Sequence, residues 1–423
     1  MVDIVFDWDY HHRKAIKTAS CYHWRMYKKL RNFVTRETKA SKSLYYINLI
    51  EESKGSTEKI WKAVNDASAR KSKISSPNCI ISDEVCYTNN KSIAGKLNKY
   101  FVSIGQALAE KFMGVRASDP RNCMPITTIC FNLQEIEETM VVKQIQSLKT
   151  KKSTGLDKIN NKLLKDAAVT IAPSLTKLFN LSICSHKFPE LWKCAKVTAL
   201  FKSNDETNPS NYRPISVLPA LSKIFEKIVH TQLYEYVDIN QLLTNKQYGF
   251  RKSRSTTTAL ARFTDEVLNS MEKGQLCGAV VLNLSKAFDT VDHSILLSKL
   301  SNLGVLLCDL LWFESYLGYR SQRVSCGQDL ASALTINCGV PQGSILGPLL
   351  FTMYINDLPS VLDYTVSLYA DDTVLYHFSS SATDMESKLN SDLHKLSIWL
   401  EKMKLTLNFD KTRFMIMGSD RIE

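Results

Sequence analysis

Residues 364–378 read YTVSLYADDTVLYHF, the stretch that is most informative about the fold. Apolar residues fill both halves of it, and the adjacent carboxylates of Asp371 and Asp372 divide the halves. Two runs of strand-forming residues around a short polar break are typical of a β-hairpin. We therefore expect Asp371 and Asp372 at the tip of a tight turn between two strands.

Two neighbouring carboxylates on such a turn repel each other, and a divalent cation would remove that repulsion. Mg²⁺ prefers oxygen ligands and leaves coordination positions for a substrate's phosphates. A pair of such ions can bridge an attacking hydroxyl and a departing phosphate. Taken alone, however, an Asp-Asp pair also fits ordinary turn chemistry, because aspartates readily bond to nearby backbone.

Two blocks upstream of the hairpin add groups that suit a ligand. Residues 338–348 read CGVPQGSILGP, a glycine-containing loop that allows close backbone approach, and Gln342 offers both a donor and an acceptor there. Residues 282–289 read LNLSKAFD and end a continuous apolar run that begins at Gly278. Such a run is typical of a strand that is buried on both faces.

A third block lies earlier in the chain, where residues 211–216 read NYRPIS. It contains Arg213 and follows Lys202. A guanidinium and an ammonium at these positions would suit a triphosphate.

The order of these blocks, NYRPIS, LNLSKAFD, GVPQGSILGP and YADD, resembles the reverse transcriptase of non-LTR (LINE-type) retrotransposons, with the jockey-like group as the nearest match. Residues 407–412, LNFDKT, resemble a downstream palm motif of the same family, and the resemblance covers roughly residues 131–417. The segment around Trp24 and Tyr27 resembles the family's linker between endonuclease and polymerase.

The resemblance implies an RNA-directed DNA polymerase with a right-hand palm and fingers. Its partners would be an RNA template, a DNA primer and dNTPs, and its cofactor two Mg²⁺ ions, with Mn²⁺ as an alternative. Carried over by position, Asp371 and Asp372 are metal carboxylates, and Lys411 supplies a proton to the leaving pyrophosphate.

The resemblance also assigns substrate contacts. Lys202 and Arg213 would hold the triphosphate, and Phe288 would stack under the sugar and exclude a 2′-hydroxyl. The remaining assignments are Gln342 and Gly343 in the dNTP pocket and Tyr369 against the primer end.

One departure from the family concerns Asn283, which stands where the family has a metal-binding aspartate. An amide oxygen is neutral, so it coordinates a cation weakly. Because even indirect changes at metal sites cost about 10–100-fold in affinity or activity, we expect weak or absent catalysis. Asp289 is expected to be a structural partner rather than a substitute ligand. The alternative function is a catalytically inactive nucleic-acid-binding remnant of the same fold.

Composition agrees with a polyanionic partner. The 423 residues carry a formal charge of +12, and residues 13–42 hold ten lysines and arginines against Glu37 alone. With Tyr22, Trp24 and Tyr27 interleaved, this segment suits phosphate gripping and base stacking, or else a solvated helix whose aromatic rings pack inward. We expect no membrane span and no signal peptide, and hence a cytoplasmic and nuclear location with reduced cysteines.

Mixed helices and strands without strict alternation predict an α+β fold. We expect a basic, mostly helical linker region over 1–130, an N-terminal extension and fingers over 131–275, and the palm over 276–423, without a complete thumb. Within these ranges the expected elements are linkers over 72–90 and 115–130, helices over 91–113, 136–148, 163–179, 218–233, 344–355 and 389–400, and strands over 197–201, 278–284 and 414–417. The sequence leaves the oligomeric state open.

Overall fold

The structure is a computed structural model that describes residues 2–53, 77–110 and 127–418, together with residues 56, 59, 60 and 64. The chain forms two compact units, Met1–Ile74 and Ser75–Glu423. The predicted linker region 1–130 therefore spans the boundary between the units.

The smaller unit contains two helices that pack on each other, α1 (Val2–Thr18) and α2 (Cys21–Glu52). His12 and Tyr27 stack between them with ring centroids 4.5 Å apart. No residue of α2 is buried, and Tyr22 stays exposed. Some of the aromatic rings thus pack between the helices, whereas others face solvent beside the basic residues.

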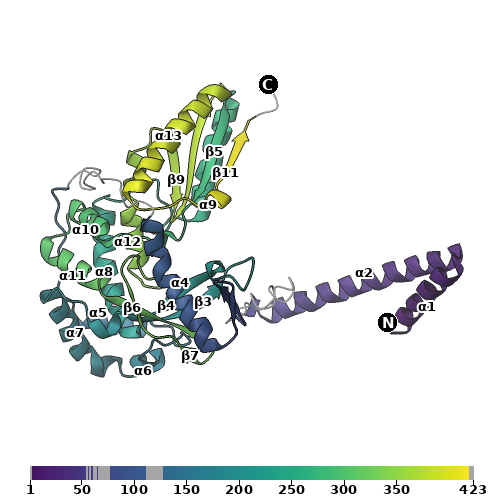
Figure 1. Cartoon of the computed structure of the whole chain (residues 1–423), viewed down its shortest axis with the longest axis horizontal. Coiled ribbons are helices and arrows are strands. Elements are labelled where there is room, and N and C mark those ends of the chain that lie inside the picture. Colours follow the sequence, from purple (N-terminus) through teal and green to yellow (C-terminus); the bar gives the residue numbers. More distant parts are fainter. Residues whose placement is uncertain are drawn as a thin grey trace. The chain divides into compact units, whose positions relative to one another are not determined.

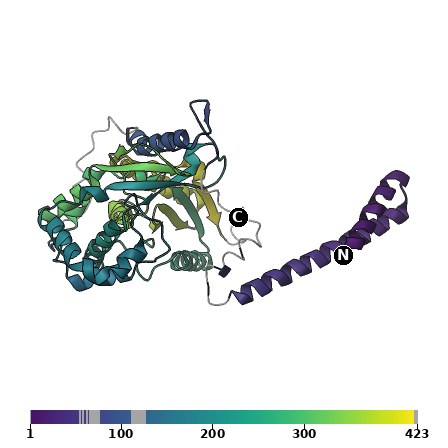
Figure 2. The ribbon, with the colours of Figure 1, turned by 90° about the horizontal axis from the view of Figure 1, so that it is seen from below.

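In the larger unit, one sheet has the strand order β4-β3-β6-β7, with β8 also paired to β6. Its strands are β3 (Cys194–Phe201), β4 (Tyr212–Val217), β6 (Arg320–Cys326), β7 (Asp329–Leu330) and β8 (Leu334–Ile336). Strands β3 and β6 are parallel and the other pairs antiparallel. Helix α4 (Asn90–Glu110) covers one face through an apolar cluster that includes Leu97, Phe101 and Val197 (Figure 2).

The prediction of a linker over 72–90 is wrong for the described part of this range, because that part contains a β-hairpin. Strands β1 (Ile80–Ser82) and β2 (Val85–Tyr87) pair there, and Ile80 is fully buried in the cluster beneath α4. The strand was not predicted because serine, proline and asparagine precede it, and it is short and anchored by the single apolar side chain of Ile80. Most of the other predicted linker, 115–130, lies outside the described residues.

A second sheet has the order β11-β5-β10-β9 with every pair antiparallel. Its strands are β5 (Leu276–Asn283), β9 (Thr365–Tyr369), β10 (Asp372–Ser379) and β11 (Arg413–Met417). Helix α9 (Thr256–Glu272) packs on the face that carries Cys277 and Ala279. Helix α13 (Ala382–Lys402) approaches the other face so closely that a Cβ on Gly278 would lie 2.6 Å from Met385 Sδ (Figure 1). Strand β5 is therefore buried on both faces, as its apolar run predicts.

The remaining helices surround a core of stacked aromatic rings, in which Phe179 and Phe225 lie 4.6 Å apart. These helices are α5 (Glu138–Gln146), α6 (Asn161–Asp166), α7 (Ala168–Cys184), α8 (Ala220–Ile239), α10 (His293–Asn302), α11 (Leu307–Leu317) and α12 (Gly347–Tyr354). Short 3₁₀ turns span Glu190–Trp192, Pro209–Asn211, Ala287–Asp289, Leu358–Ser360 and Phe409–Lys411. The fold is a mixture of helix and sheet, as predicted. Among the described residues, no helix is long and apolar enough to cross a lipid bilayer.

Candidate active site

The predicted hairpin is present, and its tip carries the acidic pair. Tyr369 pairs with Asp372 across β9 and β10, so Ala370 and Asp371 alone form the turn. Ala370 adopts a left-handed backbone with φ of 56°, which a residue other than glycine adopts at some cost. The turn therefore needs support from its surroundings.

Gln247 supplies that support, and the sequence analysis missed it. The buried side chain of Gln247 accepts hydrogen bonds through Oε1 from the backbone N–H of Ala370, at 3.0 Å, and of Gly249, at 2.7 Å. A Cβ on Gly249 would lie 2.3 Å from the Ala370 nitrogen, so only glycine fits there. The only feature of the sequence that pointed to this contact was the QYGFR stretch at residues 247–251. Its contact partner, Ala370, is more than a hundred residues away in the chain.

Asn283 lies directly opposite Asp372 in the register of β5 and β10. Its side-chain amide Nδ2 donates a hydrogen bond to Asp372 Oδ1 at 3.1 Å. The backbone of Asn283 also accepts a hydrogen bond from the N–H of Asn408 at 2.8 Å, which ties the LNFDKT stretch to the same place. The position that the sequence singles out thus touches the acidic pair, and its amide satisfies a carboxylate without any cation.

Asp371 is the more enclosed member of the pair. Burial raises the pKa of the Asp371 carboxyl, and the adjacent charge of Asp372 raises it further. The positive charges of Arg213 and Lys202 lower this pKa, so both side chains lie within electrostatic reach of Asp371. The fold therefore brings the predicted triphosphate cations toward the predicted metal carboxylates.

Four cations interact with one another in a cluster, namely Lys202, Arg213, Lys286 and Lys411. Of these, Lys202 and Arg213 also interact with Asp371. The neighbouring ammonium of Lys411, together with burial, lowers the pKa of Lys202 to about 8. Like charges that are held together and partly desolvated form a site for a polyanion, because an anion relieves their repulsion.

Lys286 is a member of this cluster that the sequence analysis did not assign. Its backbone is left-handed, with φ of 50°, and its Nζ donates to the carbonyls of Ser210, at 3.1 Å, and Tyr212, at 3.2 Å. Burial lowers the pKa of Lys286, and Arg213 and Lys411 lower it further. Lys286 therefore joins the end of β5 to the start of β4, next to Arg213.

The GVPQGS loop packs against the turn that follows β5. Gln342 Nε2 donates to both carboxylate oxygens of Asp289 at 2.9 Å, and burial raises the pKa of Asp289 to about 6. Gly343 has φ of 121°, and a Cβ there would lie 2.3 Å from the Ser216 carbonyl oxygen. Both carboxylate oxygens of Asp289 are thus engaged by Gln342.

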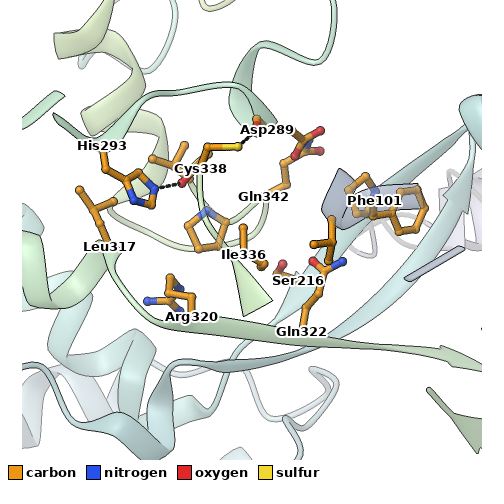
Figure 3. Close-up of a pocket in the computed structure, with 15 residues that line it drawn as sticks. Phe101, Ser216, Asp289, His293, Leu317, Arg320, Gln322, Ile336, Cys338 and Gln342 are labelled. Carbon is orange, nitrogen blue, oxygen red and sulfur yellow. Dashed lines mark hydrogen bonds between the residues drawn. The ribbon is translucent and has the colours of Figure 1, made fainter. Parts of the chain in front are cut away.

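Figure 3 shows residues of this loop around a small cavity. Asp289 and Gln342 lie on one side of it, and His293 bonds the carbonyl of Gly339 at 2.8 Å on the other. The cavity among them measures about 30 Å³, room for little more than one water molecule. We therefore do not place a nucleotide inside this cavity.

Two aromatic candidates lie at separate places around the pair. Phe288 stacks on Phe351 with ring centroids 4.4 Å apart and meets Phe250 edge-on at 6.1 Å. Tyr369 is 38% exposed and lines an apolar hollow of about 260 Å³ on the α9 side of the sheet, together with Asp372. Phe288 is thereby fixed by its neighbours, whereas the Tyr369 ring is accessible.

Hard oxygen atoms dominate the donor set at the tip, which fits a divalent cation such as Mg²⁺. Asp371 is a partly buried carboxylate beside a second one, and Asn283 adds an amide oxygen when its hydrogen bond to Asp372 is exchanged. Within the described ranges, no three carboxylate, histidine or cysteine side chains come together as a metal cluster. The sequence pattern predicts the third anion at position 283, where this chain has Asn.

The sequence of the chain is similar to those of known proteins. Residues 201–422, just over half of the chain, match the family model described as "Reverse transcriptase (RNA-dependent DNA polymerase)". The chain is 32% identical to the probable RNA-directed DNA polymerase from transposon BS of Drosophila melanogaster, over 66% of this chain and 32% of that protein. It is likewise 32% identical to the RNA-directed DNA polymerase from mobile element jockey of the same species, over 63% of this chain and 30% of that protein.

The chain thus spans about a third of the length of the curated relatives it matches. The family model matches the residues that form the acidic hairpin, the cation cluster and the glycine-containing loop. The candidate site therefore lies within the matched region. The chain belongs to the reverse transcriptase (RNA-dependent DNA polymerase) family and contains the reverse transcriptase domain of a non-LTR retrotransposon.

Proposed function

We propose that this chain extends a DNA primer with dNTPs on an RNA template, and that Asn283 weakens this activity. The observation that carries the proposal is the meeting of the Asp371-Asp372 turn with the cluster around Lys202 and Arg213. Anionic oxygens beside convergent cations form the arrangement that a metal-bound triphosphate requires. In this proposal the polymerase acts in the cytoplasm or nucleus, and all the cysteines that the structure describes are free thiols, as that location requires.

In this proposal the sheet β11-β5-β10-β9 is the palm, and the sheet built on β3 and β4 belongs to the fingers. Residues 276–423 contribute most of the palm and residues 131–275 the N-terminal extension and fingers. Strand β6 crosses from the palm range into the fingers sheet, where it lies parallel to β3. The active site then lies where the end of β5 meets the start of β4, through Lys286.

The cations have separate tasks in the proposed reaction. Lys202 and Arg213 bind the triphosphate, and Lys286 holds the β4 backbone so that Arg213 faces the acidic pair. Lys411, the neighbour of Lys202, donates a proton to the leaving pyrophosphate. Positively charged donors that are fixed before the substrate arrives stabilise developing charge without reorganisation.

Asp371 and Asp372 would hold a divalent cation, with Asn283 as a weak third ligand. Two Mg²⁺ ions, or Mn²⁺, held by these residues would supply the positive charge that activates the primer hydroxyl and stabilises the charge on the triphosphate. The turn that carries the carboxylates is held by Gln247, so they are in place before substrate binds.

The remaining residues select and orient the substrate. Phe288, packed on Phe351, is held rigidly enough to exclude a 2′-hydroxyl. Gln342 and Gly343 present the loop backbone to the nucleotide, with Gln342 fixed by Asp289. Tyr369, which is exposed at the hairpin tip, faces the primer end.

A specific observation favours a second candidate, a nucleic-acid-binding protein without catalysis. The amide of Asn283 already satisfies Asp372, so the carboxylate has a partner other than a cation. The cation cluster is intact in either case, and therefore binding and chemistry can be measured apart.

Primer extension on an RNA template with Mg²⁺ or Mn²⁺ tests the proposal. We expect slow incorporation by the unmodified chain, at least about 10–100-fold faster incorporation by Asn283→Asp, and none by Asp371→Asn. Binding of the same primer–template is followed alongside by anisotropy. If the unmodified chain and Asn283→Asp both bind the primer–template but neither incorporates nucleotides, the chain is a nucleic-acid-binding protein without catalysis. Full activity of the unmodified chain would refute the proposal that Asn283 weakens catalysis.

A further inference from the structure

Helix α4 lies outside residues 201–422, the range that matches the family model, and yet it reaches the candidate site. A Cβ on Gly105 of this helix would lie 2.1 Å from the carbonyl oxygen of Asp289 and 2.9 Å from Cys338 Sγ. A side chain at position 105 would therefore push the helix away from the turn that follows β5. Phe101, one helical turn earlier, lines the small cavity beside Asp289 (Figure 3).

A buried amide fixes α4 against strand β6. Asn98 is 1% exposed, and its Nδ2 donates to the carbonyl of Ser332 at 2.8 Å. Its Oδ1 accepts a hydrogen bond from Gln322 Nε2 of β6 at 3.2 Å. Because a shift of the helix would leave these buried groups without partners, α4 holds one position relative to the site.

Tyr100 is the residue of α4 that meets the cation cluster. The Nζ of Lys286 lies 5.8 Å from the centroid of the half-buried Tyr100 ring, within the range at which an aromatic face attracts an ammonium group. Burial raises the pKa of the Tyr100 hydroxyl, and the negative charge of Asp289 raises it further, so the ring is uncharged at neutral pH. The ring joins the carbonyls of Ser210 and Tyr212 as a neutral partner of the Lys286 ammonium.

We infer that Tyr100 is a positioning residue of the polymerase site, which holds the ammonium of Lys286 and, through it, the start of strand β4. Ser210 and Tyr212, whose carbonyls Lys286 bonds, lie directly before Arg213 in the chain, so a displaced Lys286 would release the backbone that carries this guanidinium.

The chemistry of the ring suits this task. A carboxylate beside Lys286 would cancel part of the positive charge of the cluster, whereas a neutral aromatic face stabilises the ammonium and leaves its charge available to a triphosphate. The inference rests on the proposed function and adds helix α4 to the groups that prepare the site for a dNTP.

Calorimetric titration of the full chain with inorganic tripolyphosphate at pH 7 tests the inference without needing catalysis. Tyr100→Leu removes the ring, and Tyr100→Phe removes only the hydroxyl. The matched control is Tyr87→Leu, because the Tyr87 ring faces Lys96 of the same helix at 4.8 Å, and Lys96 pairs with Asp83 rather than with the cluster. Each substitution is also made in the Lys286→Gln background. Thermal unfolding verifies that the variants are folded, and Tyr100→Met takes the place of Tyr100→Leu if the latter is not.

We expect Tyr100→Leu to bind tripolyphosphate about 5-fold more weakly, because the ammonium loses its aromatic partner. Tyr100→Phe should retain the affinity, since the ring face is kept, and Tyr87→Leu should leave it unchanged. In the Lys286→Gln background, Tyr100→Leu should cause no further loss, because the two side chains form one contact.

A further loss in that background would overturn the inference, since it would show that Tyr100 acts independently of Lys286. Equal losses in Tyr100→Leu and Tyr100→Phe, or in Tyr100→Leu and Tyr87→Leu, would also overturn it. Primer extension keeps the two proposals apart. If tripolyphosphate binding follows the expected pattern while Asn283→Asp extends no primer, the catalytic proposal fails and the role of Tyr100 in anion binding stands.

Discussion

The two halves of the candidate site differ in how their charges are satisfied. In the acidic half, Asn283 bonds Asp372 at 3.1 Å and Gln342 bonds Asp289 twice at 2.9 Å, so side-chain amides serve as partners for carboxylates. In the basic half, Lys202 lies beside Lys411, and this neighbour lowers its pKa to about 8. The carboxylates of the acidic half thus have amide partners, whereas Lys202 and Lys411 of the basic half repel each other.

Because of this difference, a single substitution can remove one property of the site and leave the other. A cation cluster keeps its attraction for a polyanion as long as its charges remain, whereas a two-metal centre needs enough negative charge to hold two dications. In the proposed site, an amide in place of an anion at position 283 would affect the acidic half alone. Substrate binding and chemistry should therefore respond to different variants.

The largest expected effect concerns the amide that holds Asp289. Gln342→Ala removes both hydrogen bonds to a buried carboxylate, which should cost about 2 kcal/mol of unfolding free energy at pH 8. The raised pKa of Asp289, about 6, means that the folded state binds more protons than the unfolded state between about pH 4 and 6. Stability therefore falls as pH rises through that window, and the variant should extend the fall to higher pH.

Urea denaturation at pH 8 and pH 4.5 measures this effect, with the exposed Gln106→Ala as the control. At pH 4.5 Asp289 is protonated, and most of the loss should vanish. An equal loss of stability at pH 8 and pH 4.5 would mean that Gln342 is not a partner for the ionised carboxylate of Asp289 in the way that Asn283 is for Asp372.

The next effect concerns the basic half. Lys202→Gln should weaken binding of inorganic tripolyphosphate by about 10-fold at pH 7, or about 1.4 kcal/mol. Because Lys202 loses its proton near pH 8, affinity of the unmodified chain should fall between pH 7 and pH 9, and the variant should show a flatter profile. Calorimetric titration with tripolyphosphate measures this effect in Lys202→Gln and in the distant Lys177→Gln. If the affinities of the two variants depend on pH in the same way, Lys202 does not belong to the anion-binding cluster.

The same amino acids show how far a sequence reveals such a site. The hairpin and its acidic tip follow from alternating apolar residues around Asp371, and β5 follows from its continuous apolar run, because local pattern determines both. The β1–β2 hairpin was not predicted, because short strands in polar surroundings are fixed by tertiary contacts such as those of Ile80.

Contacts between distant segments were the least predictable part of the site. Gln247 supports Ala370 and lies at a bridge between residues 247 and 368. Lys286, whose backbone is left-handed, bonds the carbonyl of Tyr212 in β4. Neither property is visible in residue type or spacing. The family resemblance indicated Arg213 and Lys202 by position, whereas Lys286, in the middle of a recognised block, needed the three-dimensional arrangement.

The smallest expected effect on stability concerns position 283 without metal. Asn283→Asp replaces a hydrogen bond by repulsion between two partly exposed carboxylates, so we expect a loss of about 1 kcal/mol at pH 7 in the presence of a chelator. The loss should shrink near pH 4, where the new carboxyl is protonated, and Asn283→Ser should show no such pH dependence. An unchanged or raised stability of Asn283→Asp would indicate that the amide is no better a partner for Asp372 than a carboxylate.

The most direct measurement is the affinity of the full chain for Mn²⁺, unmodified and as Asn283→Asp, followed by the paramagnetic signal of the free ion. Our account holds that an amide occupies the place of a third anion beside Asp371 and Asp372. It predicts that Asn283→Asp binds Mn²⁺ at least about 10-fold more tightly, and that Asp371→Asn abolishes the difference. Equal Mn²⁺ affinity of the unmodified chain and Asn283→Asp would contradict it.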